Sequence, residues 1–114
     1  VTDIQIESDR FSSAERIAET FGGVCLLKGP GTVVAGMGRT TRVIAGGNCG
    51  MATGGMGDLL TGIIVSLVGQ GVTVFEAATL GASIHNRAAD KAKNDGLRGM
   101  VPSDLLPIIR DLVK

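Results

Sequence analysis

Aromatic residues are scarce in this chain of 114 residues, which contains three phenylalanines and neither tryptophan nor tyrosine. Because single-stranded nucleic acids are commonly bound by stacking their bases on aromatic rings, this scarcity argues against that class of ligand. A surplus of positive charge is also missing, since eleven Lys and Arg residues balance eleven Asp and Glu residues. General nucleic-acid binding needs a basic surface, so we expect no nucleic-acid partner.

Long apolar runs and metal-binding cysteine patterns are missing as well. The longest mostly apolar stretch, residues 59–72, is interrupted by polar residues and glycines and is too short to cross a bilayer. No signal-peptide pattern precedes it, and we expect no membrane partner. The two cysteines lack metal spacing, and Cys25 lies in an apolar run that favours a small buried residue. A reducing, cytoplasmic location is the default for such a chain.

Glycine, in contrast, is abundant, with 18 of the 114 residues, against a usual share of ~7%. Glycines outside low-complexity sequence predict tight turns and backbone that approaches a ligand closely. Hydrophobic residues make up 44% of the chain, which excludes intrinsic disorder. The length allows one domain at most.

Hydrophobic periodicity predicts a mixed α/β fold. We expect a helix over 8–21 that Ser8 caps and Gly22-Gly23 ends, and then an apolar strand at 24–27. An unbroken apolar strand is typical of a parallel sheet covered on both faces. The remaining elements are expected as a hairpin with strands at 32–37 and 41–45, and as helices at 58–68, from 73 to about 94–96, and at 103–113.

Three strands form a small sheet for four helices. We therefore expect the sheet to be incomplete, with its missing strands lying N-terminal to Val1. The spacing of Thr73 and Glu76 predicts a capping box at the start of the long helix.

A glycine-rich loop before Asp58 is the main chemical signal, with six glycines among residues 46–57. Glycines let backbone N–H groups turn toward a ligand, and a helix N-terminus adds unpaired N–H donors and a positive dipole end. Together they predict a phosphate site formed around Gly54, Gly55 and Gly57. Asp58 beside it could accept a proton from a substrate hydroxyl during phosphoryl transfer.

Asp58 could instead be a simple N-cap, although capping requires one residue and not six glycines. The loop is not a Walker A motif, because no Gly-Lys-Ser/Thr follows, and no Rossmann glycine signature follows the first strand.

Other polar residues leave two interpretations open. The Lys28–Thr32 turn could contact ribose or phosphate oxygens, or be an ordinary strand exit, and Asn48 could bind a ligand or hold its own turn. His85 lies on the apolar stripe of its helix, which favours a hydrogen-bonded core histidine over a catalytic one. Asp90 is by default a helix residue.

Five stretches of the chain carry a family resemblance. They are Lys28–Thr32, Gly47–Asp58, Gly62–Ile64, Ile84–Asp90 and Gly99–Leu105. Together they resemble NAD(P)H-hydrate dehydratases over nearly the whole chain, and the 47–58 stretch is specific, because the wider ribokinase-like superfamily shares only a looser glycine pattern. The resemblance implies a three-layer α/β/α ribokinase-like fold, with residues 1–114 as the C-terminal portion of the domain. The upstream His-Pro-Gly-Glu segment of the family is absent from these residues.

The resemblance also implies an activity, in which the hydroxyl of NAD(P)H hydrate is phosphorylated by ADP or ATP with Mg²⁺ and phosphate is then lost. Asp58 would contact the hydrate and act as the base. The nucleotide side would be formed by Lys28, Gly29, Pro30, Gly31, Thr32, Asn48, Gly54, Gly55 and Gly57. A homo-oligomer and a fused or partner epimerase domain are expected, and no side-chain metal ligands are assigned.

Two alternatives remain open at this point. One is a ribokinase-like kinase for a small alcohol, which would use the same base and anion loop. The other is a non-catalytic module that binds adenylates without turnover.

Overall fold

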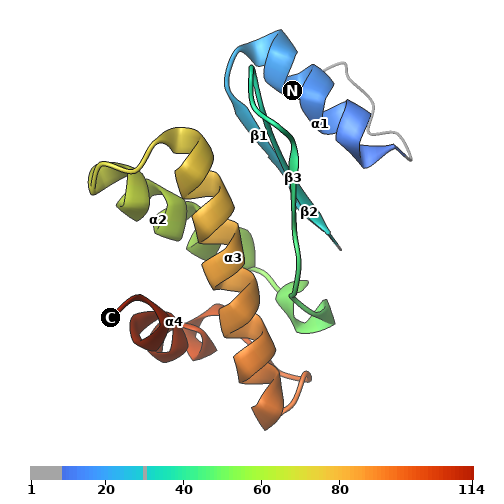
Figure 1. Ribbon diagram of the computed structural model, residues 1–114. Helices are drawn as coiled ribbons and strands as arrows, with labels where there is room; N and C mark the ends of the chain where they lie inside the picture. Colours follow the sequence, from blue (N-terminus) through green and yellow to red (C-terminus); the bar gives the residue numbers. More distant parts are fainter. Residues whose placement is uncertain (1–8, 30) are drawn as a thin grey trace.

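The computed structural model describes residues 9–29 and 31–114, so the expectations for Ser8 and Pro30 lie outside the described residues. Helices and strands follow in the predicted order (Figure 1). The helices are α1 (Arg10–Phe21), α2 (Met56–Gly69), α3 (Val74–Ala92) and α4 (Leu106–Val113), and the strands are β1 (Val24–Leu27), β2 (Thr32–Gly36) and β3 (Arg42–Ile44).

Helix α1 begins at Asp9, whose carboxylate accepts hydrogen bonds from the backbone N–H groups of Phe11 (3.1 Å) and Ser12 (3.3 Å). These bonds hold the pKa of the Asp9 carboxyl below its usual value, with the Ser12 hydroxyl as the largest contributor. Gly22 ends the helix with a φ of 72°, and its N–H donates to the carbonyl of Ala18. A left-handed glycine of this kind is a common helix stop.

The three strands form one sheet in the order β1-β2-β3, and both pairings are antiparallel. The predicted hairpin is confirmed as β2 and β3, whereas the expectation of a parallel sheet is wrong for the described strands. The chain reverses its direction between β1 and β2, so that Leu27 pairs with Val33. The unbroken apolar run has another cause, because Val24 and Leu26 pack toward α3 while Cys25 and Leu27 pack toward α1.

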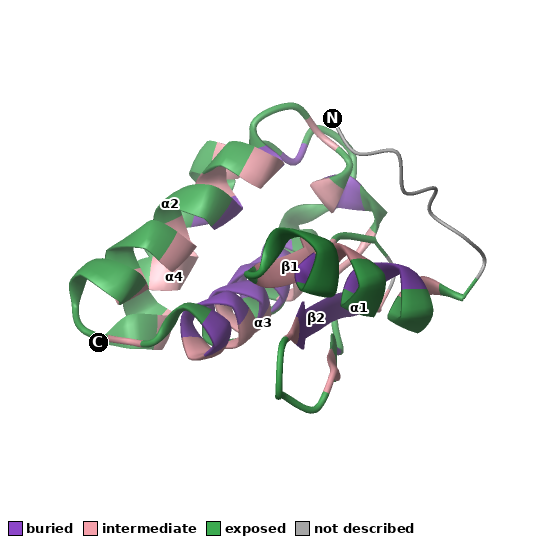
Figure 2. Cartoon of the chain, turned by 90° about the horizontal axis from the view of Figure 1, so that it is seen from above, coloured by how far each residue is buried: buried purple, intermediate pink, exposed green. Residues whose placement is uncertain are grey.

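The sheet is covered by helices on both faces, with α1 on one side and α3 on the other (Figure 1). Buried residues gather on β2 and along α3, while α2 and α4 are mostly exposed or half-buried (Figure 2). Helix α2 packs on α3 at Gly81, where an added Cβ would lie 2.7 Å from Ile64. The small residues of α3 therefore allow the close packing of the helices.

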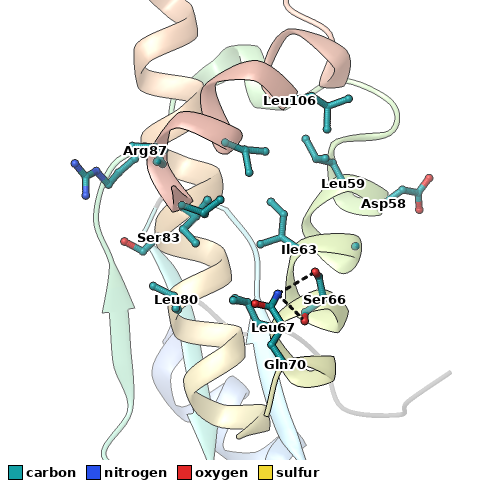
Figure 3. A pocket seen from close by; sticks show the side chains of 15 residues that line it. Asp58, Leu59, Ile63, Ser66, Leu67, Gln70, Leu80, Ser83, Arg87 and Leu106 are labelled. Carbon is teal, nitrogen blue, oxygen red and sulfur yellow. Dashed lines mark hydrogen bonds between the residues drawn. The ribbon is translucent and has the colours of Figure 1, made fainter. Parts of the chain in front are cut away.

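Helices α2, α3 and α4 surround an open groove of about 790 Å³. Its wall is mainly aliphatic, including Leu59, Ile63, Leu67 and Leu80 (Figure 3). Asp58 stands at its rim, and its side chain points away from the other lining residues (Figure 3).

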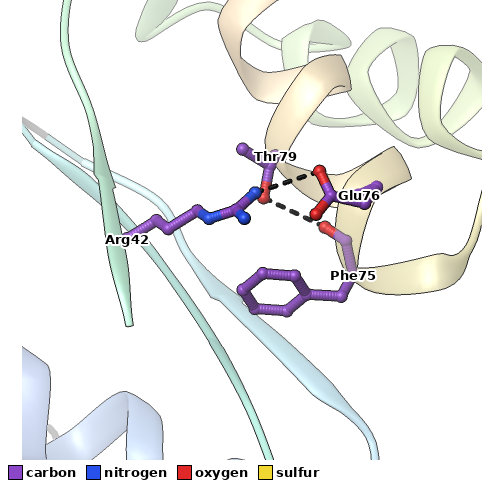
Figure 4. A network of polar contacts seen from close by, with 4 residues as sticks. All are labelled: Arg42, Phe75, Glu76 and Thr79. Atoms are coloured by element: carbon purple, nitrogen blue, oxygen red, sulfur yellow. Dashed lines mark hydrogen bonds and ion pairs between the residues drawn. The ribbon is translucent and has the colours of Figure 1, made fainter. Parts of the chain in front are cut away.

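The predicted capping box of α3 is wrong in its side-chain contacts. Thr73 is the N-cap residue, but its side chain forms no capping hydrogen bond. Glu76 pairs instead with Arg42 of β3 at 3.0 Å, and this hydrogen bond lowers the pKa of the Glu76 carboxyl (Figure 4). The Arg42 guanidinium also lies 4.8 Å from the ring centre of Phe75, so a cation–π contact joins β3 to α3.

Candidate functional site

The glycine-rich loop between β3 and α2 is held by side chains from α3. The backbone N–H of Gly47 donates to the Asp90 carboxylate (2.9 Å), and the Asn48 amide donates to the same carboxylate (3.3 Å) and to the carbonyl of Ala89 (3.0 Å). The Asn48 amide oxygen accepts from the N–H of Gly50 and so starts a short 3₁₀ helix at Cys49–Met51. The side chain of Asn48 thus holds its own turn in this structure.

The loop leads into the N-terminus of α2. Gly55 is the N-cap residue at a φ of 90°, and no side chain of the described part of the chain caps this terminus. Asp58 lies within the first turn and is exposed, so its interpretation as the N-cap is wrong. First-turn N–H groups have no intrahelical partner, which leaves those of Gly57 and Asp58 oriented for an anion. Gly54, just before the cap, is exposed and has open space around it.

Lys28 meets this terminus from the end of β1. Its ammonium nitrogen lies 3.0 Å from the position that a Cβ on Gly57 would occupy. Two stretches that are 29 positions apart in the sequence are thereby brought together, as the resemblance implied. A cation beside a helix N-terminus forms a favourable site for a phosphate group.

The turn after Lys28 is held by Arg10, a residue that the sequence analysis did not single out. The Arg10 guanidinium donates to the carbonyls of Lys28 (2.9 Å), Leu27 (3.0 Å) and Gly31 (3.1 Å). The Thr32 hydroxyl donates to the carbonyl of Gly29 at 3.2 Å, so this hydroxyl also serves the turn itself. No sequence signal pointed to Arg10, because its position in the first turn of α1 is typical of an exposed residue.

Asn86 and Asp90 of α3 also support the glycine-rich loop, a role that the sequence patterns did not predict. The Asn86 amide donates to the carbonyls of Ala45 and Gly46 at the start of the loop, while Asp90 binds the N–H of the adjacent Gly47. The family resemblance at 84–90 was the available signal, but it gave no role to either side chain. Their contacts show that α3 fixes the path of the glycine-rich loop.

His85 is buried, with 2% of its surface exposed, as expected for a core histidine. The expectation that it is hydrogen-bonded is wrong for one ring nitrogen, since Nε2 is buried without a hydrogen-bond partner among the described atoms. Burial lowers the pKa of His85, and the charge of Lys28 lowers it further. The imidazole is therefore neutral near pH 7.

The two methionines beside the loop fill space, since Met56 is buried in a cluster with Ala88 and Ala89 and Met51 packs against that cluster. Cys25 is half-buried, and burial raises the pKa of its thiol, whereas Cys49 is exposed.

Taken together, the residues around the start of α2 offer an anion site at Gly57 and Lys28 and an exposed carboxylate on the adjacent residue, Asp58. These groups could bind a phosphoryl donor and remove a proton from a hydroxyl.

Comparison with known proteins identifies the family. A family model described as NAD(P)H-hydrate dehydratase matches residues 1–111. The bifunctional NAD(P)H-hydrate repair enzyme of Vibrio cholerae is 47% identical over 110 residues, which are 96% of this chain and 22% of that protein. The ADP-dependent (S)-NAD(P)H-hydrate dehydratase of Neisseria meningitidis is 41% identical over 111 residues, which are 96% of this chain and 38% of that protein.

The ADP/ATP-dependent NAD(P)H-hydrate dehydratase from Bacillus subtilis, co-crystallised with ATP/Mg²⁺, has a similar structure, with a TM-score of 0.82 at 25% identity. The alignment covers 96% of this chain and 41% of that one, so the chain spans less than half the length of these relatives. The likeness confirms the ribokinase-like fold, of which this chain is similar to the C-terminal part. With a family model matched over almost its whole length, the chain belongs to the NAD(P)H-hydrate dehydratase family.

Proposed function

We propose that the full-length protein uses ADP to return (6S)-NAD(P)H hydrate to NAD(P)H, as a cytoplasmic metabolite-repair enzyme. The observation that carries this proposal is the convergence of the Lys28 ammonium and the uncapped α2 terminus at Gly57, directly beside Asp58. The names of the relatives support the same reaction, and one of them is described as ADP-dependent.

The reaction needs a base and an anion site at one place. Asp58 accepts the hydroxyl proton of the hydrate while the hydroxyl oxygen forms a bond to the terminal phosphorus of ADP. The phosphoanhydride bond breaks, and AMP leaves. The N–H groups at Gly57 and the Lys28 ammonium stabilise the charge on the transferred phosphoryl group. The phosphorylated carbon then loses phosphate together with a proton from the neighbouring carbon, which restores the ring double bond. Phosphate is a far better leaving group than hydroxide.

The nucleotide fits the residues present, because the space over Gly57 is one that a Cβ would enter. A metal cage does not fit them in the same way, since no group of three or more His, Cys, Asp or Glu side chains gathers within residues 9–29 and 31–114. If Mg²⁺ accompanies the nucleotide here, its ligands would come mainly from phosphate oxygens and water, as is usual for this ion.

A carboxamide at position 58 tests the proposed base. We expect Asp58→Asn in the full-length protein to lower turnover by about 10²–10⁴, the usual contribution of a general base. Because Asp58 is exposed and forms no cap, this variant should unfold at the same temperature as the wild type. Turnover is followed by the recovery of NADH absorbance, and near-normal turnover would remove Asp58 from the mechanism.

Product analysis separates the proposed dehydratase from its alternatives. Free phosphate with recovered NADH absorbance indicates a dehydratase, a stable phosphorylated product indicates a small-molecule kinase, and binding without turnover indicates an adenylate sensor.

Because several relatives are bifunctional repair enzymes, an epimerase domain fused to or associated with this one belongs to the same proposal, as does a homo-oligomer. No helix in the described part of the chain is long and apolar enough to cross a bilayer.

A further inference from the structure

One buried polar atom has no function in the mechanism above. Nε2 of His85 is buried without a partner in an otherwise apolar stripe of α3. Buried polar side-chain atoms almost always have a hydrogen-bond partner, because leaving one unpaired is costly. An apolar residue would fill the same space without that cost, so the position of His85 calls for an explanation.

The packing of α3 on the sheet places His85 level with Lys28. Phe75, near the start of α3, contacts Gly36, which pairs with Val24 at the start of β1. Further along both elements, Ala82 of α3 lies in the apolar cluster against which Leu26 of β1 packs, which indicates that α3 and β1 run in the same direction. Ten helical residues from Phe75 to His85 rise about 15 Å, and four strand residues from Val24 to Lys28 rise about 13 Å.

The packing of α3 on α2 places His85 beside the anion site as well. Gly81 packs on Ile64 in the middle of α2, and Ala89 belongs to the same buried cluster as Met56 in the first turn of α2. His85 lies midway between Gly81 and Ala89, one helical turn from each. Burial and, to a smaller extent, the charge of Lys28 lower the pKa of His85, which agrees with the placement of the ring near the Lys28 ammonium.

We propose that His85 is a positioning residue for Lys28. The two side chains are not hydrogen-bonded in this structure, but a rotation of the Lys28 side chain would let its ammonium donate to Nε2 of His85, which would hold the cation near Gly57. A neutral imidazole with its proton on Nδ1 has an acceptor at Nε2, and an ammonium group is a donor. The ammonium then meets the nucleotide phosphates without first losing the freedom of a long side chain. His85 itself touches neither nucleotide nor hydrate. This inference rests on the proposed function, because it assigns a purpose to Lys28.

Two substitutions of His85 separate positioning from core filling. His85→Leu introduces an apolar side chain of similar size and removes the hydrogen-bond acceptor, whereas His85→Gln keeps an acceptor. We expect ADP binding, measured by titration calorimetry on the full-length protein, to weaken about tenfold in His85→Leu and to recover in part in His85→Gln. In turnover, KM for ADP should rise while kcat changes little.

A double-mutant cycle with Lys28→Ala is the decisive measurement. Once the ammonium is gone, His85→Leu should have almost no further effect on ADP affinity. Ala82→Gly, at a buried position one turn earlier on α3, controls for general loosening of the helix and should leave ADP affinity unchanged. Melting curves of the free proteins show whether each variant folds, and His85→Gln carries the test if His85→Leu does not.

The outcomes distinguish this inference from the function on which it rests. Wild-type affinity in both His85 variants, or an equal loss with and without Lys28, would overturn the positioning role while leaving ADP binding intact. Failure of the wild-type protein to bind ADP would overturn the proposed function together with this inference. A loss that depends on Lys28 and is partly rescued by glutamine supports the proposal.

Discussion

Gly57 illustrates how a single missing side chain can serve binding at the expense of stability. Its backbone is not left-handed, so alanine fits the local conformation, but the new Cβ would lie 3.0 Å from the Lys28 ammonium. We expect Gly57→Ala to raise the free energy of unfolding by about 0.5–1 kcal/mol, because alanine favours a helix over glycine. The same change should weaken ADP binding, because the ammonium must move away.

Gly69 offers a matched control for this prediction. It is the last residue of the same helix, also outside the left-handed region, and nothing lies within 4 Å of where its Cβ would stand. Gly69→Ala should therefore leave ADP affinity unchanged in the same calorimetric titration. Equal losses in the two variants would indicate a general effect of alanine on α2 and not displacement of Lys28.

His85 should make stability depend on pH. Burial and the Lys28 charge hold its pKa in the folded state below the ordinary histidine value of 6.5, so the unfolded chain binds more protons between these two pKa values. The stabilisation by the neutral ring is complete above about pH 6.5 and is lost as the pH falls through the lower, folded pKa. Urea unfolding at several pH values should show a smaller loss on acidification in His85→Gln than in the wild type, and parallel curves would refute this assignment.

At the scale of elements, the Asp90 carboxylate accepts two of the hydrogen bonds that join α3 to the glycine-rich loop. Asp90→Ala would leave the N–H of Gly47 and one contact of the Asn48 amide without their acceptor. We expect a destabilisation of about 1–3 kcal/mol, measured by urea unfolding, together with weaker ADP binding as the loop loosens. Asp95→Ala, at an exposed acidic residue just after α3, is the control and should change neither quantity.

Local sequence patterns were sufficient to predict most elements but not their partners. Gly22, the hairpin around Gly38 and the glycine-rich run before α2 mark boundaries through backbone conformation, which is a local property. The antiparallel pairing of β1 and the ion pair of Glu76 with Arg42 depend on residues distant in the sequence. Periodicity contains no information about such partners.

The same distinction holds for the site. Glycines and a helix start predicted the anion loop, and the family resemblance connected it to Lys28. The supports of that loop, Arg10 and Asp90, act through side chains that any surface helix could carry. Their roles emerge only when the chain folds and brings carbonyl or N–H groups within reach.

At the scale of the whole molecule, α2 is more apolar than its present burial requires. Met56 and Leu60 are its buried residues, while Val65 is 62% exposed and Val68 is 40% exposed. A helix that is apolar on all sides normally lies in a protein interior, which agrees with the prediction of an incomplete sheet. Relatives of more than twice this length contain further chain that could cover such a face.

Exposed apolar surface of this kind should cause the 114-residue chain to self-associate. We expect Val65→Thr combined with Val68→Thr to shift sedimentation velocity profiles toward the monomer. Val43→Thr, on the opposite part of the molecule at 48% exposure, keeps a β-branched side chain and should leave the profile unchanged. A monomeric wild-type chain at micromolar concentrations would contradict this prediction.

The clamp by Arg10 has a consequence for how this motif can be used. Three carbonyl oxygens of the Lys28 turn converge on a guanidinium that belongs to a helix 18 positions earlier. The Lys28–Thr32 motif is therefore not sufficient by itself. In another protein without an equivalent of Arg10, the turn would lose the hydrogen bonds that hold its backbone. A search or a design that copies the turn must copy its distant anchor as well.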